Sequence, residues 1–187
     1  MASNLLIVDG TAIVFGVSGS FSPADAGTQH AAAITDVLTL SALADAAGRQ
    51  SDKVDLTATR APEYELFAAV DFTGETPTAG NTVDYYWLPS TSGTQANGNI
   101  AGNSGADAAA PGGALGSITL AEFILLAVPI GSLTVHDGAV VQNGHVGRLF
   151  PPTRYGQLLV VNNSGDAFEA DDVEMHHVLA PVIPQGQ

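Results

Sequence analysis

The residues of this sequence best suited to chemistry lie near its C-terminal end. They are the carboxylates and imidazoles of Glu169, Asp171, Asp172, Glu174, His176 and His177. Two carboxylates held a fixed distance apart can hydrolyse glycosides, and imidazoles with carboxylates can hold zinc or calcium. The segment therefore raises two hypotheses, a hydrolase that uses Asp171, Asp172 or Glu174, and a metal site.

Spacing argues against both kinds of chemistry. Adjacent histidines in a strand point to opposite faces, so His176 and His177 cannot jointly hold one metal ion. Neither His136 nor His145 completes a two-histidine motif, and the calcium-loop pattern does not occur. Clustering alone also does not fix a distance between carboxylates. We therefore interpret the segment as a solvated acidic turn with surface or interface histidines, and we predict no catalytic residue, metal or cofactor.

A second candidate for binding chemistry is the aromatic run Tyr85-Tyr86-Trp87. Aromatic rings offer flat apolar faces on which sugars can stack. Strand alternation puts Tyr85 and Trp87 on one side, which suits a core, and leaves Tyr86 on the other. Tyr86 is thus the candidate residue if the protein binds glycans. The alternative interpretation is that all three aromatic residues are ordinary strand residues.

Composition narrows the class of protein. The chain has 187 residues, five basic and nineteen acidic side chains and a net charge of -14, so it would repel phosphate backbones and nucleic acid is a poor partner. It has no cysteine, which excludes disulfides and thiolate metal sites. Charged residues are 13% of the chain and its mean hydropathy is +0.21, which suits a surface made for assembly. The apolar runs are too short to cross a membrane.

Strand patterns dominate the middle of the chain. Residues 63–72 alternate, with Tyr64, Leu66, Ala68, Val70 and Phe72 on one face, and residues 82–88 repeat the pattern. Residues 118–128 could begin with a helical turn, but we favour a buried strand over 123–128. These elements predict an all-β domain, a β-sandwich or jelly roll.

The last fifth of the chain is predicted to be a β-hairpin. Apolar runs at residues 157–161 and 173–179 flank the turn sequence Asn-Asn-Ser-Gly-Asp, with prolines at both ends. This hairpin would be part of a sandwich wall.

Two further segments are candidates for contact with other chains. Residues 1–33 are predicted to be an N-terminal arm with the first strands, ahead of a β-sandwich domain over 34–184. Residues 90–117 form a long loop rich in glycine, asparagine and alanine, which we expect to be mobile or ordered by a partner. The candidate interface residues are Phe15, Phe21, Ile100, Asn103, Arg148 and Arg154. The two arginines are expected to pair with carboxylates, within the chain or across a subunit boundary.

The order of features in residues 63–184 resembles that of small virion proteins of tailed bacteriophages. The resemblance rests on the strand TVDYYWLPS, a Gly/Asn/Ala-rich insertion, an apolar run, the segment FPPTRYGQLLVVNNSGDAF and a closing strand that ends at Pro181. Such proteins are similar to capsid decoration, or cement, proteins. The resemblance implies a jelly-roll-like module on the outside of a capsid, around a symmetry axis, without enzymatic activity. It assigns no role to an individual residue.

Together, these observations predict a non-enzymatic structural protein that decorates and stabilises a phage capsid exterior. Its expected partners are the major capsid protein and further copies of itself, with a trimer expected, and its expected location is the virion surface. The alternative is a carbohydrate-binding or host-adhesion module of a virion or tail that uses Tyr86.

Overall fold

A computed structural model of the chain describes residues 5–9, 11–17, 33–57, 60–112 and 118–186. The elements are β1 (Leu5–Asp9), β2 (Ile13–Gly16), β3 (Asp36–Val37), β4 (Gly48–Gln50), β5 (Val54–Asp55), β6 (Glu63–Asp71), β7 (Thr82–Ser90), the 3-10 turn η1 (Ile100–Gly102), β8 (Ala108–Ala110), α1 (Leu120–Ile124), β9 (Val128–Thr134), β10 (Val141–Leu149), β11 (Tyr155–Asn163) and β12 (His176–Gly186). Within these ranges no helix is both long and apolar enough to span a membrane. The predicted all-β domain is confirmed.

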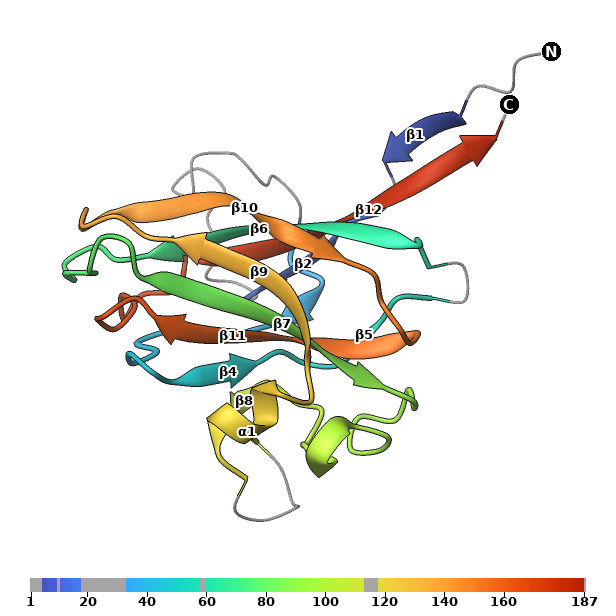
Figure 1. Cartoon of the computed structure of the whole chain (residues 1–187), viewed down its shortest axis with the longest axis horizontal. Coiled ribbons are helices and arrows are strands. Elements are labelled where there is room, and N and C mark those ends of the chain that lie inside the picture. The colour runs from blue at the N-terminus through green and yellow to red at the C-terminus, as the bar shows by residue number, and fades with distance from the viewer. Residues whose placement is uncertain (1–4, 10, 18–32, 58–59, 113–117, 187) are drawn as a thin grey trace.

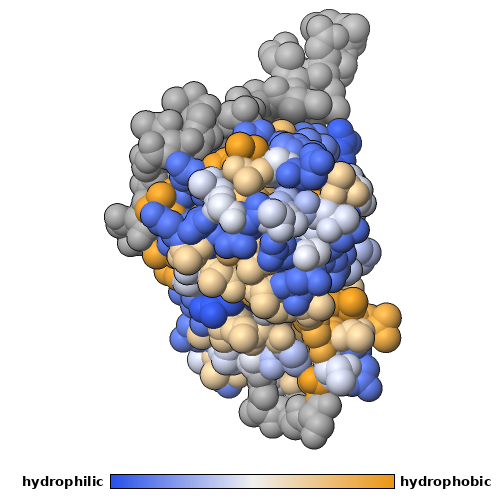
Figure 2. Space-filling view, turned by 90° about the vertical axis from the view of Figure 1, so that its left-hand side faces the viewer, coloured by the Kyte–Doolittle hydropathy of each residue, from blue (hydrophilic) through white to orange (hydrophobic). Residues whose placement is uncertain are grey.

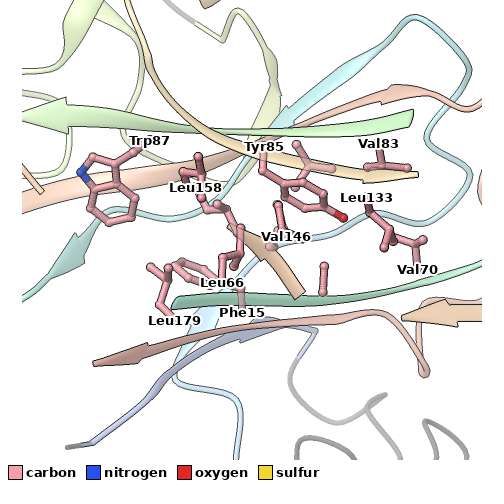
Figure 3. Close-up of a cluster of buried hydrophobic side chains, with 14 of the residues drawn as sticks. Phe15, Leu66, Val70, Val83, Tyr85, Trp87, Leu133, Val146, Leu158 and Leu179 are labelled. Atoms are coloured by element: carbon pink, nitrogen blue, oxygen red, sulfur yellow. The ribbon is translucent and has the colours of Figure 1, made fainter. Parts of the chain in front are cut away.

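The strands form one strongly curled sheet (Figure 1). Its order is β3-β2-β12-β6-β10-β9-β7-β11-β4-β8, with β1 added to β12 and β5 added to β11. Strands β3, β2, β12 and β6 make a first wall, and β7, β11, β4 and β8 make a second wall. The two walls face each other across the core like the layers of a sandwich (Figure 3). The narrower expectation of a jelly roll stays a prediction.

Residue alternation explains how β6 and β7 fill the space between the walls. In β6, Tyr64, Leu66, Ala68 and Val70 all point into the core, and Phe72 follows them. In β7, Val83, Tyr85 and Trp87 do the same from the opposite wall. Because side chains alternate with a period of two along a strand, the predicted inward faces of both strands are confirmed.

One polar contact crosses the core between the walls. His177 of β12 and Tyr85 of β7 are both fully buried, and the His177 Nε2 atom lies 3.3 Å from the Tyr85 hydroxyl oxygen. Burial strongly raises the pKa of Tyr85, so this hydroxyl stays protonated. His176 is also fully buried. The prediction of surface or interface histidines is therefore wrong, because both residues belong to a strand that is covered on both faces.

The predicted C-terminal hairpin is wrong as well. β11 pairs with β7, β4 and β5 in the second wall, whereas β12 pairs with β6, β2 and β1 in the first. The first apolar run, 157–161, lies within β11, and the second, 173–179, overlaps only the start of β12. The residues between them do not make a tight turn, because Asn162 directs its amide to the Leu43 and Asp166 carbonyls and the chain then crosses to the other wall.

The segment after the glycine-rich loop folds as a helix, so the buried strand predicted over 123–128 is wrong. Thr119 accepts a hydrogen bond from the Glu122 amide, and the Glu122 carboxylate accepts one from the Thr119 amide. This reciprocal capping box satisfies two amides of the first turn. Phe123 packs under the helix against Leu88, Leu159 and Val161, so α1 covers the outer face of the second wall.

Candidate functional site

The acidic residues and the histidines near the C-terminal end lie in different environments. Asp171 and Asp172 lie in the connection between β11 and β12, while His176 and His177 are buried in β12. Burial raises the pKa of Asp172, with a smaller contribution from Asp171. Among the residues that the structure describes, no three histidine or carboxylate side chains come close enough together to hold a metal ion.

The two arginines proposed as interface residues form ion pairs within the chain. Arg148 in β10 reaches Glu63 and Glu65 of β6, at 2.9 and 3.0 Å. Arg154 makes two hydrogen bonds of 2.7 Å to the Asp55 carboxylate. The expected pairing with carboxylates is confirmed, and the partners belong to the same chain. Both arginines remain on the surface, so contact with another chain stays a prediction.

The other interface candidates have different environments. Phe15 is fully buried in the core and offers no surface to a second chain. Asn103 is 1% exposed, and its side-chain oxygen accepts a hydrogen bond from the Gly105 amide, which shapes the loop. Ile100 is half-buried against the cluster under α1, as is the glycan-binding candidate Tyr86. Phe21 lies outside the described residues.

Contacts within the chain hold residues 91–112 of the glycine-rich loop. The Lys53 ammonium donates hydrogen bonds to the Ser92, Thr94 and Asn97 carbonyls, at 3.1, 2.7 and 2.8 Å. Gln50 likewise donates to the Ala106 carbonyl. Such contacts offset the ordering entropy of a segment with few large side chains.

A second anchor of the loop is Asp107. Its carboxylate accepts two hydrogen bonds from Arg49, at 2.8 and 2.7 Å, and one from the Thr39 hydroxyl at 2.7 Å. Burial alone would raise the pKa of Asp107, but the hydrogen bonds from Arg49 and Thr39 outweigh burial and hold the pKa below its usual value. The loop thus carries its one charge in a paired form.

Acid should weaken this anchor. A carboxylate whose pKa is lower in the folded state stabilises the fold fully above its unfolded pKa of about 3.9, and that contribution is lost as the pH falls through the folded pKa. Asp107→Asn should therefore lower the free energy of unfolding by about 2 kcal/mol at pH 7 and flatten its decline below about pH 4. Urea unfolding followed by Trp87 fluorescence measures both effects. Asp137→Asn, on an exposed turn, is the matched control, and equal profiles for the two variants would contradict the assignment.

The loop and α1 together form a low-charge end of the molecule. Residues 88–135 carry two charged side chains, Asp107 and Glu122, and the first is paired with Arg49. Leu125 and Leu126, just after α1, are 81% and 51% exposed. Figure 2 shows hydrophobic side chains gathered toward the lower end of the molecule, the level at which α1 lies in Figure 1. Exposed apolar groups of this kind commonly mark contact surfaces.

Beside this end lies an edge strand that has no charged side chain. Within the described part of the chain, β8 pairs with β4 alone, and its sequence is Ala-Ala-Ala. Natural edge strands are commonly guarded by charges, proline or a bulge. An uncharged edge beside Leu120 of α1 is therefore suited to contact with another protein surface.

A projecting ribbon extends from the opposite end of the molecule. β1 pairs with the last residues of β12, from Leu5 opposite Gly186 to Asp9 opposite Val182, and Figure 1 shows the two strands leaving the body together. Their sequences, LLIVD in β1 and VIPQG at the end of β12, are largely apolar. Because a two-stranded ribbon is marginally stable in water by itself, this ribbon is a candidate for contact with a further surface.

Comparison of the chain with protein-family models, curated proteins and solved structures finds no match in any of the three.

Proposed function

We propose that this chain is a non-enzymatic structural protein of a phage virion that decorates and stabilises the capsid exterior. Its partners in this proposal are the major capsid protein and further copies of the chain in a trimer. The proposal extends the resemblance in residues 63–184, and the observation that carries it is the projecting ribbon of β1 and β12.

The ribbon supports assembly because it is a two-stranded unit that leaves the body of the sheet (Figure 1). Beyond Val182, β12 pairs with β1 and with no other described strand. Packing on a neighbouring copy would bury the apolar residues of both strands, and such burial is the main favourable term in association. Closed rings of identical subunits are the common outcome when such contacts repeat. The ribbon would thus link copies around a symmetry axis.

The low-charge end supports attachment to a second surface. The chain carries a net charge of -14, so two surfaces meet with least repulsion where charges are few. Residues 91–112, Leu125 and Leu126 supply such a place, opposite the ribbon. In this proposal the low-charge end contacts the capsid shell, while the acidic remainder of the surface avoids adhesion to nucleic acid.

The ribbon should decide the oligomeric state. The full chain should sediment as a trimer, and a variant without residues 1–10 should sediment as a monomer while keeping the fluorescence of buried Trp87. Analytical ultracentrifugation measures this difference. A variant without residues 1–4 keeps β1 and is the control, which should remain trimeric. A monomeric full chain would contradict the proposed assembly.

Capsid attachment has its own test. Purified chain mixed with mature capsids of the same phage should pellet with them, and Leu125→Asp together with Leu126→Asp should reduce the bound fraction at least tenfold. Val140→Asp together with Asn143→Asp adds the same two charges at exposed positions outside residues 88–135 and should leave binding intact. Failure of the unaltered chain to pellet with capsids would overturn the proposed function.

The glycan-binding alternative at Tyr86 has less support. The side chain packs beside Phe123, and burial raises the pKa of the Tyr86 hydroxyl. A ring that is half covered by α1 presents less of its face for stacking than an exposed platform would.

A further inference from the structure

A pocket of about 790 Å³ opens where the two walls of the curled sheet approach each other at their free ends. The Asp52 amide donates a hydrogen bond to the Val37 carbonyl at 2.9 Å and closes this seam at one point. Beyond that bond, β3 lies on one side and β5 on the other, and the connection from β1 to β2 completes the rim. The mouths of curled and barrel-like sheets are common ligand sites, and the volume lies in the range of ligand pockets.

The pocket combines an apolar floor with a polar rim. The floor is made by the buried residues Val54, Leu56, Ala61 and Tyr64, with Ile13, Pro181 and Ile183 beside them. The rim carries the hydroxyls of Thr11 and Thr35 and the charged side chains of Asp36, Asp55 and Arg60. Ligand sites usually have this composition, in which apolar surface provides affinity and a few polar groups provide orientation.

Two of the charged groups at the pocket already have partners. The Lys53 ammonium is turned to the carbonyls of the glycine-rich loop, and Asp55 is held by Arg154. Asp36 and Arg60, in contrast, have no ion pair with any described residue. Asp36 accepts a hydrogen bond from the Thr35 hydroxyl at 2.8 Å, and its burial raises its pKa. The pocket therefore offers one carboxylate and one guanidinium to a ligand.

This pair of groups selects the chemistry of the ligand. Asp36 and Asp55 would repel an anionic ligand, and Arg60 would repel a cationic one. A net charge on the ligand therefore adds little to its binding free energy. A purely apolar ligand would remove water from Asp36 without replacing its hydrogen bonds, which is costly. The hydroxyls of a saccharide can donate to Asp36 and accept from Arg60, while the C–H faces of the ring pack on the apolar floor. Hydrogen bonds to charged groups are also the stronger kind.

We propose that the pocket between β3 and β5, with Asp36 and Arg60 at its rim, is a binding site for a neutral mono- to trisaccharide. The site borders the ribbon, because Ile183 lines the pocket and also pairs with Val8 of β1, and its lining does not include Leu125 or Leu126. Such a site would let the proposed virion protein bind cell-surface or environmental glycans. The experiment below tests saccharide binding separately from capsid attachment.

The test uses the full chain and neutral saccharides of glucose, galactose, mannose and N-acetylglucosamine up to three units long. Nuclear magnetic resonance of the 15N-labelled chain should show shifts at Thr35, Val54 and Ala61 with at least one of these sugars. Asp36→Asn should weaken that binding about tenfold, since the variant replaces a charge-assisted hydrogen bond by a neutral one. Asp171→Asn makes the same change on the exposed β11–β12 connection and should bind as the unaltered chain does.

If Asp36→Asn does not fold, Arg60→Gln tests the same site. Arg60 is exposed, so its substitution should leave folding intact. It should weaken the same sugar by a similar factor. The proposal is overturned if no sugar of the panel shifts the pocket residues, if both variants bind unchanged, or if inorganic phosphate or sialic acid binds the pocket in place of neutral sugars.

Discussion

Gly156→Ala should destabilise the fold by about 3 kcal/mol, the upper part of the range for overpacked cores. A Cβ atom at this position would lie 2.3 to 2.4 Å from three atoms of the Trp87 indole, and Trp87 is fully buried. Neither partner can move away easily, since Gly156 is paired with Pro89 on one side and Val54 on the other. Urea unfolding followed by fluorescence measures the loss, because Trp87 is the one tryptophan of the chain.

Gly144→Ala is the matched control for this substitution. Gly144 also lies within a strand, yet its added Cβ would meet a single atom within 4 Å, the flexible Leu133 Cδ1 at 3.2 Å. We expect its free energy of unfolding to stay within about 0.5 kcal/mol of the unaltered chain. Equal losses for the two variants would show that the indole does not pack on Gly156 as described.

Lys53→Met should release the glycine-rich loop from the body. The substitution keeps an apolar stem but removes the ammonium that holds the Ser92, Thr94 and Asn97 carbonyls. Because hydrogen bonds to charged groups contribute roughly 1.5–3 kcal/mol each, and less at the surface, we expect the loop to open more easily by about 2 kcal/mol. Hydrogen exchange of the amides in residues 91–112 should then speed up about thirtyfold.

The control for Lys53→Met is Arg60→Met. It removes one positive charge as well, but Arg60 forms no ion pair or hydrogen bond with the described residues. Exchange in the loop should stay at its original rate in this variant. If Lys53→Met also leaves loop exchange unchanged, the loop is held by its other contacts and Lys53 is not its anchor.

The strands were predictable where the sequence alternates or stays apolar. In β6 and β7 the period of two identifies the inward faces directly. The apolar run in β11 was also recognised, and the structure explains why it does not alternate: the inner face meets the core and the outer face lies under α1. Strands that are buried on both faces lose the alternation.

Long-range pairing was not predictable from the same patterns. The turn residues after β11 predicted a local hairpin, but each terminal strand finds its partners in a different wall, which no local signal encodes. Lys53 is likewise separated from the carbonyls it binds by 39 to 44 positions. The loop therefore looked unsupported in the sequence.

One missed element did have a local signal. Thr119-Leu-Ala-Glu122 is a capping-box sequence followed by apolar residues, and it marks the start of α1. No local sequence signal predicts the burial of His176 and His177, because histidine is found both on surfaces and in cores. Of the candidate site, the low-charge loop could be located in the sequence, whereas the ribbon and the pocket depend on which strands become neighbours.

The proposed virion role is tested most directly by a cryo-EM map of purified virions whose genome encodes this chain. We expect density for the chain on the outer capsid surface, grouped in threes, with the β1–β12 ribbons between copies and the end bearing Leu125 and Leu126 against the shell. A capsid whose outer surface carries no copy of the chain would contradict it.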